Sequence, residues 1–411
     1  MNIAVMGYGT VGSGVVEIIE QDSPIRKTRT DADLKVSKIL VRTVRNDGIH
    51  DSKFTTDIND IVNDESITIV AEAIGGIHPA YEYTKACLEA GKHVVSSNKE
   101  LVAEKGQELL EIAKEKNVNY LFEASVGGGI PIIRPLSVCL AGNEIEKLNG
   151  ILNGTTNFIL TRMIFDNLTF DTALEMAQKN GYAEKDPTDD IMGYDACRKI
   201  CILASLCFGH QIDPEDIHTE GITKITPEDV SYAENWNSVI KLVATAEKRK
   251  DGKAYIIVSP AIVKKSSLLS SVDDVYNAIL AKGNNVGQVV FYGRGAGKLP
   301  TASAMVGDII DCANHNDKRR LFGWGKKKEN VILDYKEIPN QYYICLNVED
   351  SETTQHEIRN AFGNIHLLAR SGAYSSELAF ITEKFTENQV REKLDSLSSA
   401  HLKSLIRIAD C

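Results

Sequence analysis

The pattern of apolar and polar positions in the first 135 residues is that of alternating strands and helices. Apolar residues recur at helical spacing in residues 78–90 and 99–116. Strands that alternate with such helices predict a parallel sheet covered by helices on both faces. Five short apolar runs have the length of buried strands: residues 3–6, 36–41, 67–73, 93–96 and 119–122.

The pattern changes near residue 144. A strand over residues 145–152 is followed by helices after Thr155 and Thr169, and a long helix is expected over residues 189–208. Two apolar runs, 241–248 and 253–263, flank Asp251-Gly252, which is a hairpin signal. A third run, residues 287–292, can join them. These runs predict a mixed sheet, which would also suit a subunit interface.

The last part of the chain has a third pattern. A helix over residues 301–312 and a Gly/Lys-rich linker near residue 325 precede it. The expected order over residues 338–411 is β-α-β-β-α-β, which is typical of a ferredoxin-like unit. The six segments are residues 341–348, 354–362, 365–369, 376–381, 387–397 and 403–409.

Composition narrows the class of protein. The 411 residues are 43% hydrophobic and 25% charged with a net charge of -11, which fits a globular protein and disfavours nucleic-acid binding. No apolar run approaches the roughly 18 residues that a membrane helix needs. Eight cysteines are scattered and Met1 leads directly into a strand pattern. We therefore expect a cytoplasmic protein without a membrane or nucleic-acid partner.

A glycine-rich motif follows the first apolar run. Gly7-Tyr8-Gly9-Thr10-Val11-Gly12 matches Gly-x-Gly-x-x-Gly between a strand and a helix. Gly7 permits the turn, Gly9 lets the backbone approach a pyrophosphate, and Gly12 lets the helix pack on the strand. The alternative is a glycine turn without a ligand, but this context favours a dinucleotide site. We expect a Rossmann-type domain over residues 1–135, with Thr10 and Val11 also at the cofactor.

The end of the second strand bears on the choice of cofactor. An NAD site has Asp or Glu there to bind the ribose hydroxyls. Here Arg42 occupies the place, with Arg45 nearby, and a guanidinium suits a 2′-phosphate. The sequence therefore predicts that NADP(H) is preferred over NAD(H). The alternative is that Arg42 is an ordinary surface arginine.

Lysines and carboxylates supply candidate chemistry. Lys99 follows a strand at a helix start, where the helix dipole disfavours a cation and so favours a functional role. Asp195 and Lys199 share one helix face, which spacing alone explains better as a solvated ion pair. Glu184 lies in the preceding loop. Carboxylates near a lysine could instead bind an amino group while the lysine supplies a proton.

A second glycine-rich turn spans residues 123–131. Its three consecutive glycines, 127–129, free the backbone to curl and to expose carbonyl oxygens, which suit a hard cation. A flexible hinge between domains explains the composition equally well.

These segments together resemble monofunctional homoserine dehydrogenase over roughly residues 1–320, with no kinase region before the Rossmann unit. The resemblance implies reversible NAD(P)H-dependent reduction of L-aspartate 4-semialdehyde to L-homoserine, in threonine, methionine and isoleucine biosynthesis. It also implies a homodimer or homotetramer. The Rossmann domain would comprise residues 1–135 plus about 300–325, and residues 136–299 would form a substrate-binding and dimerisation domain. The matching segments are residues 7–12, 73–76, 98–99, 123–131, 149–157, 181–187, 193–199 and 293–301.

The resemblance also implies roles for particular residues. Lys99 and Lys199 would be catalytic, with Lys199 the better candidate for the proton donor. Glu184 and Asp195 would bind the substrate. The cofactor would be lined by Gly75, Gly181 and Gly297, besides Lys99. Backbone carbonyls would hold a monovalent cation, expected to be sodium, at Glu123, Val126, Gly128 and Ile130.

Residues 338–411 resemble an ACT domain, a module that can bind an amino-acid effector such as threonine. After Val348-Glu349-Asp350 the module typically has a turn with proline and glycine, whereas residues 351–356 read Ser-Glu-Thr-Thr-Gln-His. A structural or dimer-forming role therefore stays open beside a regulatory one. Two other functions compete with the enzyme as a whole: a catalytically silent amino-acid sensor, and a dehydrogenase of another small amino acid or hydroxy acid.

Overall fold

The N-terminal part of the chain is a parallel sheet with helices on both faces. The computed structural model describes residues 1–43, 47–315 and 318–411. The sheet has six strands in the order β3-β2-β1-β4-β5-β6, as the apolar runs predicted, with the short β3 added to those five. Its strands are β1 (Asn2–Met6), β2 (Lys35–Leu40), β3 (Phe54–Thr55), β4 (Ile67–Glu72), β5 (His93–Ser96) and β6 (Tyr120–Leu121).

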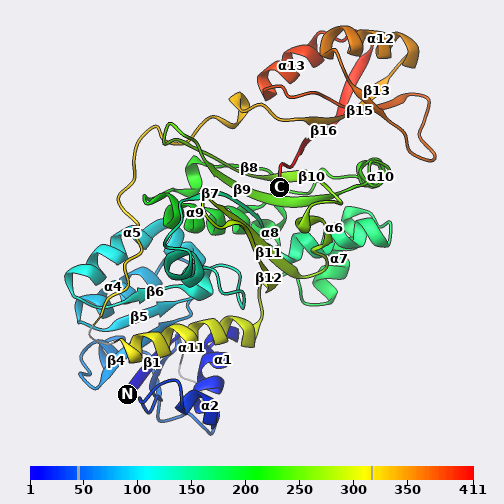
Figure 1. The fold of residues 1–411 in the computed structure, drawn as a ribbon. Helices are drawn as coiled ribbons and strands as arrows, with labels where there is room; N and C mark the ends of the chain where they lie inside the picture. The colour runs from blue at the N-terminus through cyan, green and yellow to red at the C-terminus, as the bar shows by residue number, and fades with distance from the viewer. Residues whose placement is uncertain (44–46, 316–317) are drawn as a thin grey trace.

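A helix from much later in the sequence packs on this sheet. The helix α11 (Lys298–Asn314) contacts α1 as well as β4 and β5, and Figure 1 shows it (yellow) beside the blue N-terminal helices. The two helices approach closely because α1 presents Gly14 to Ala302. The other helices here are α1 (Thr10–Glu20), α2 (Pro24–Lys27), α3 (Asn59–Val62), α4 (Ala80–Glu89) and α5 (Lys99–Glu115).

A ten-stranded mixed sheet forms the rest of the framework, in the order β12-β11-β7-β9-β10-β16-β13-β15-β14 with β8 also paired to β10. The hairpin at Asp251-Gly252 forms between β9 and β10. The run near 287–292 joins them through β11 and β7, and the sequence did not predict β11. The first six strands are β7 (Ile145–Ile151), β8 (His218–Thr219), β9 (Ser238–Lys248), β10 (Ala254–Lys264), β11 (Tyr276–Gly283) and β12 (Gly287–Arg294).

The helix expected over residues 189–208 is two helices, so that expectation was wrong. Gly193 has φ +86, a left-handed conformation that interrupts the helix and turns the chain. The consequence is that Asp190 and Asp195 come from different helices and approach each other. The helices of this region are α6 (Gly154–Phe165), α7 (Phe170–Lys179), α8 (Thr188–Ile191), α9 (Tyr194–Phe208) and α10 (Pro227–Asn235).

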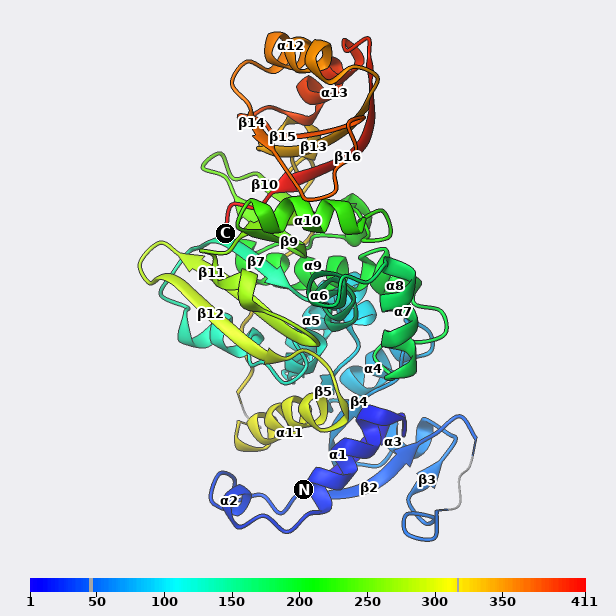
Figure 2. The ribbon, with the colours of Figure 1, turned by 90° about the vertical axis from the view of Figure 1, so that its right-hand side faces the viewer.

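The C-terminal unit continues the same sheet. Its last strand runs parallel to β10, with Ala261 opposite Arg407, and Figure 2 shows the unit at the far end from the N-terminus. The order of its elements is β-α-β-β-α-β, as expected from the sequence. They are β13 (Tyr342–Val348), α12 (Ser351–Phe362), β14 (His366–Leu368), β15 (Glu377–Ile381), α13 (Glu387–Asp395) and β16 (Ala400–Ile408).

The segment that leads to this unit is anchored rather than freely solvated. The side chain of Trp324 is buried against Gly106 of α5, and its indole N–H donates to Gln211. The lysines that follow it are exposed, as expected. Within the described ranges, no helix combines the length and the apolarity that crossing a membrane would require.

Candidate active site

The glycine-rich loop after β1 has the conformation that a dinucleotide requires. Gly7 has φ +93, and a Cβ on it would lie 2.6 Å from the carbonyl oxygen of Ala73. A Cβ on Gly12 would lie 1.9 Å from the carbonyl oxygen of Gly7. Gly9 caps α1 without a side-chain hydrogen bond and is exposed, as is Thr10. The first amide groups of α1 therefore face an open approach that suits a phosphate.

The loops after β4 and β5 meet this loop at one sheet edge, because β1, β4 and β5 are parallel neighbours. Asn98 ties the two loops together. Its side-chain Nδ2 donates to the carbonyl oxygens of Ile74 (2.9 Å) and Gly76 (2.6 Å). Its Oδ1 accepts from Leu101 and caps α5. These bonds fix the exposed Gly75 relative to Lys99, the first residue of α5.

The remaining residues expected at the cofactor lie on three separate elements. Arg42 is exposed directly after β2, while Arg45 falls outside the described residues. Gly297 precedes α11, whose first residue Lys298 forms an ion pair with Glu17 of α1 at 2.6 Å. Gly181 lies in an exposed turn after α7.

Two lysines share one buried carboxylate. Asp195 is 2% exposed. Its Oδ1 lies 2.6 Å from Nζ of Lys99, and its Oδ2 accepts from Nζ of Lys199 at 2.7 Å. The ammonium of Lys199 also donates to the carbonyl oxygen of Leu152 at 2.8 Å. The alternative of a solvated i,i+4 pair is therefore wrong, since both Asp195 and Lys199 are buried.

The structure adds two residues that the sequence did not single out. The Nδ2 group of Asn153 donates to Oδ2 of Asp195 (2.9 Å) and to Oδ1 of Asp190 (2.6 Å). Its Oδ1 accepts from Thr156 and caps α6. An asparagine before a helix signals such a cap, but the sequence holds no signal for its bridge between two carboxylates.

The charges of this cluster shift its pKa values in opposite directions. Burial opposes ionisation of Asp195, but Lys199 and Lys99 outweigh it and hold its pKa below the usual range. The negative charge of Asp195 in turn raises the pKa of Lys99. Burial and the nearby Asp195 raise the pKa of Asp190. The site therefore keeps Lys99 as an ammonium group beside one firmly ionised carboxylate.

Glu184 is not brought into this cluster. It is exposed in the turn before α8, where its carbonyl oxygen accepts from Gln178. In the described part of the chain, its carboxylate makes no hydrogen bond or ion pair with the lysines or with Asp195.

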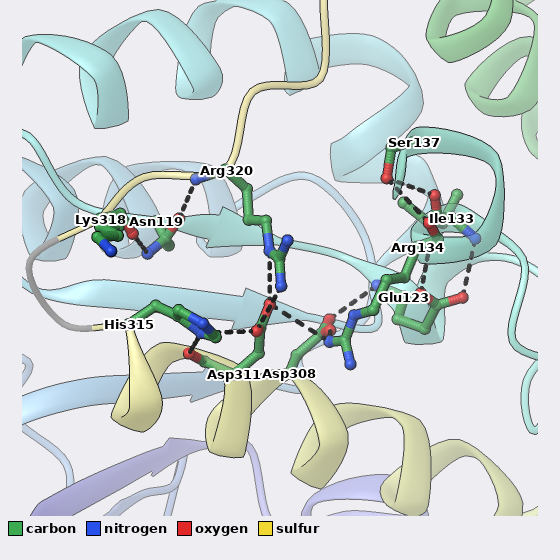
Figure 3. A network of polar contacts seen from close by, with 10 residues as sticks. All are labelled: Asn119, Glu123, Ile133, Arg134, Ser137, Asp308, Asp311, His315, Lys318 and Arg320. Carbon is green, nitrogen blue, oxygen red and sulfur yellow. Dashed lines mark hydrogen bonds and ion pairs between the residues drawn. The ribbon is translucent and has the colours of Figure 1, made fainter. Parts of the chain in front are cut away.

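The segment expected to hold a cation is fixed by a polar network (Figure 3). The carboxylate of Glu123 accepts from the backbone N–H groups of Ile132, Ile133 and Arg134 at 2.5–2.8 Å. Its own N–H donates to Asp308 of α11, which also pairs with Arg134 at 2.8 Å. Because these bonds occupy its carboxylate, Glu123 would offer a cation its backbone carbonyl oxygen.

The glycines of this segment pack closely rather than forming a loose hinge. Gly128 has φ +54, and a Cβ on it would lie 2.5 Å from the carbonyl oxygen of Gly295. The N–H of Gly129 donates to the carbonyl oxygen of Arg294. Val126 and Ile130 are buried on either side. Among the described residues, no group of three His, Cys, Asp or Glu side chains converges as a metal site, so a cation here would rely on carbonyl oxygens.

Comparison with known proteins identifies the family. Residues 7–123 match the family model of the homoserine dehydrogenase NAD-binding domain, and residues 131–310 match that of homoserine dehydrogenase. The chain belongs to the homoserine dehydrogenase family. The enzyme is therefore an oxidoreductase that acts on a CH–OH group and interconverts L-homoserine and L-aspartate 4-semialdehyde in amino-acid biosynthesis.

Individual relatives agree with this assignment. The homoserine dehydrogenase of Bacillus subtilis is 34% identical over 97% of this chain and 95% of its own. The structure of a homoserine dehydrogenase from Thiobacillus denitrificans superposes with a TM-score of 0.90 at 34% identity, covering 100% of the enzyme and 98% of that chain. A hyperthermophilic archaeal homoserine dehydrogenase in complex with NADPH has a TM-score of 0.64 at 32% identity. The superposition covers 75% of this chain and 96% of the archaeal chain.

Proposed function

We propose that the enzyme uses NADP(H) and that Lys99 and Lys199 are its catalytic residues. The observation that carries this proposal is the single carboxylate of Asp195, which holds both ammonium groups within 2.7 Å. Lys99 begins α5, and Asn98 before it donates to Gly76 in the loop after β4 (residues 73–79), which we call the cofactor loop. The lysines therefore lie where the cofactor loop and the substrate region meet.

The chain's own groups supply the proton chemistry. A bound nicotinamide supplies the hydride that reduces the C4 aldehyde. Lys199 already donates to Asp195 and Leu152, so one N–H is left to point at the aldehyde oxygen. Lys199 protonates the alkoxide as it forms, and Lys99 stabilises its negative charge. Donors held in place in this way contribute a few kcal/mol each to lowering the barrier.

Carboxylates orient the amino acid. We assign the substrate amino group to Asp195 and Glu184, with Asp190 as a further partner. The hydrogen bonds from Asn153 to Asp190 and Asp195 support this role, because they aim both carboxylates at one point. Glu184 is exposed in the turn before α8, so it would have to turn inward over a bound substrate.

NADP(H) is preferred over NAD(H) in this proposal. The position of the exposed Arg42 directly after β2 supports it, as does the archaeal relative described in complex with NADPH. The pyrophosphate would lie on residues 7–12, with Gly75, Gly181 and Gly297 along the remaining cofactor.

A monovalent cation, sodium, would be held by backbone carbonyls of Glu123, Val126, Gly128 and Ile130. The network around Glu123 supports this site, because it fixes the segment against α11. Among the described residues, no backbone N–H from a turn or loop donates to these four carbonyl oxygens. Activity measured in sodium, potassium and choline chloride at equal ionic strength tests it. Equal rates in all three salts would exclude the cation.

We divide the chain into residues 1–135 plus about 300–325, residues 136–299, and an ACT-like unit over residues 338–411. A cavity of 520 Å³ between the last two units is lined by Glu220, Lys224, Arg391 and Arg407. Charges of both signs suit an amino-acid effector such as threonine. The eight unpaired cysteines support a cytoplasmic location, and we propose a homodimer or homotetramer.

The cofactor and the substrate are tested in one assay. NADP⁺ and NAD⁺ are compared as oxidants of L-homoserine and of other hydroxy amino acids, with kcat/KM as the readout. We expect NADP⁺ with L-homoserine to give the highest value. A higher value with NAD⁺ would refute the NADP preference, and faster oxidation of another hydroxy amino acid would refute the substrate.

A further inference from the structure

Glu72 is a buried carboxylate at the centre of the cofactor edge. It is the last residue of β4, is 0% exposed, and lies opposite Met6 of β1 and Ser96 of β5. On one side of β4 in the sheet, β1 leads to the glycine-rich loop at Gly7. On the other side, β5 leads to Lys99.

Hydrogen bonds connect Glu72 to both neighbouring loops. Its Oε1 accepts from the N–H of Ile74 at 2.7 Å, and its Oε2 bonds to Oγ of Ser96 at 2.5 Å. The same Oγ accepts from the N–H of Asn98 at 3.0 Å. Asn98 then reaches back to the carbonyl oxygen of Ile74. These bonds close a ring in which a shift of Glu72 moves the cofactor loop and the start of α5 together.

Among the residues that the structure describes, no cation forms an ion pair with Glu72. Burial raises the pKa of Glu72 to about 7, while the hydrogen bonds of Ser96, Ile74 and Asn98 act in the opposite direction. Burial, together with the charge of Glu72, raises the pKa of the phenol of Tyr120 on β6. A carboxyl in this state carries a proton on one side of neutrality and a negative charge on the other.

Charged groups on the helices that pack against β4 are paired elsewhere, except for Glu89 at the end of α4, which is exposed. On α4, Lys85 lies near Glu108. On α11, Asp308 pairs with Arg134, and Asp311 pairs with Arg320. In the described part of the chain, none of them forms an ion pair with Glu72. A change in the protonation state of Glu72 therefore acts mainly on its hydrogen bonds with Ile74 and Ser96.

We propose that Glu72 is a positioning residue that sets the cofactor loop and Lys99 in register, and that its protonation changes the strength of this coupling. A neutral Glu72 donates its proton from Oε2 to Ser96. When it ionises, the direction reverses and the Ser96 hydroxyl donates to the carboxylate. The catalytic efficiency thereby depends on pH through a group that touches neither substrate nor cofactor. This inference rests on the proposed role of Lys99.

The pH profile of kcat/KM for L-homoserine, together with the NADPH dissociation constant from fluorescence, tests the proposal. The full-length enzyme is compared with Glu72→Gln, which keeps a neutral hydrogen-bonding side chain. We expect an inflection near pH 7 in the parent that Glu72→Gln lacks. The matched control is Glu89→Gln, an exposed glutamate at the end of α4, which should keep the inflection. An unchanged inflection in Glu72→Gln would overturn the proposal.

Ser96→Ala gives a second and directional test. The serine hydroxyl favours the ionised form of Glu72, so its removal should move the inflection to higher pH, whereas a merely structural loss would lower activity equally at every pH. We expect Glu72→Ala to weaken NADPH binding roughly five- to hundredfold, because the N–H of Ile74 loses its buried acceptor. Should Glu72→Ala not fold, Glu72→Gln and Ser96→Ala decide the matter.

A Lys99→Met variant separates this inference from the proposed function. It should lose kcat at every pH while its NADPH dissociation constant keeps the inflection. If Lys99→Met stays fully active, the proposed role of Lys99 fails. If Lys99→Met is inactive but Glu72→Gln retains the inflection, only the role of Glu72 fails.

Discussion

Lys99 and Asp195 lie 96 positions apart in the sequence, yet Nζ of Lys99 is 2.6 Å from Oδ1 of Asp195. One residue begins a helix of the parallel-sheet part, and the other lies in a helix that covers the mixed sheet. This ion pair therefore closes the site between the two parts of the molecule. Because Asp195 also holds Lys199, the loss of one carboxylate would release both ammonium groups.

We predict that Asp195→Asn destabilises the fold as well as the reaction. Removing the charge leaves the buried Lys199 without its counter-ion, which costs about 3–5 kcal/mol for buried pairs. Urea unfolding should show this loss of free energy, and kcat should fall in parallel. The control Asp171→Asn changes an exposed carboxylate on α7 and should leave both quantities unchanged. An unaltered unfolding free energy in Asp195→Asn would mean that the ion pairs contribute nothing net.

Arg42 should determine the preference between cofactors. An arginine on a phosphate forms charge-assisted hydrogen bonds of about 1.5–3 kcal/mol, so Arg42→Ala should lower kcat/KM with NADP⁺ roughly ten- to hundredfold. The value with NAD⁺ should stay within about twofold, since a ribose hydroxyl gains little from a guanidinium. Arg29→Ala alters another exposed arginine of this part and serves as control. Equal losses with both cofactors would remove Arg42 from discrimination.

Removal of residues 338–411 should cost stability more than chemistry. The deletion exposes the edge of β10. It also removes the hydrogen bonds that Tyr343 and Ser404 donate to the buried Asp229, and the ion pair of Arg407 with Glu220. The homoserine dehydrogenase family models match residues 7–123 and 131–310, which lie outside this unit. We expect a lower Tm and a kcat within a few-fold of the parent. A truncated protein that is folded but inactive would contradict this.

Stability should fall as the pH rises from about 4 to 7. Burial and the charge of Glu123 raise the pKa of Asp308 to about 7, against the opposing effect of Arg134. Above pH 4 the unfolded carboxyl is ionised, whereas the folded one keeps its proton up to about pH 7, so the folded state binds more protons across this window. Each such group lowers stability by a few kcal/mol, on the order of its shift.

Unfolding measured at pH 4, 5, 6 and 7 checks this dependence. Asp308→Asn should make it shallower, while the buried Glu72, whose pKa burial also raises to about 7, keeps the rest of the slope. Asp311→Asn should not make it shallower, because Arg320 and Arg134 overcome the effect of burial and lower the pKa of Asp311. The contribution of Asp311 is therefore lost only in acid below about pH 4. A slope in Asp308→Asn as steep as in the parent would assign the effect to another group.

The sequence could predict those features that depend on local pattern. Apolar runs and the glycines at 7, 9 and 12 predicted the parallel sheet and its loop, because strand length and turn geometry are local properties. The break at Gly193 was missed, since one glycine within apolar periodicity is tolerated in many helices. The strand β11 was missed, and with it the connection of β12 to the mixed sheet.

The candidate site was only partly visible in the sequence. The spacing of Asp195 and Lys199 favoured a solvated pair, because burial depends on tertiary contacts that spacing does not report. The ion pair with Lys99 joins distant segments, and Asn153 resembled an ordinary helix cap. The buried Glu72 at the end of an apolar strand carried no pattern that marks its hydrogen bonds to Ile74 and Ser96. Local patterns therefore predicted the elements that carry the site, but not the hydrogen bonds and ion pairs between them.

The most direct test of the central claim is the rate of hydride transfer to L-aspartate 4-semialdehyde by Lys199→Ala in a single turnover. Loss of a general acid should slow this step roughly a hundredfold to ten-thousandfold, while the NADPH dissociation constant stays as in the parent. A transfer rate equal to that of the parent would show that Lys199 does not supply the proton.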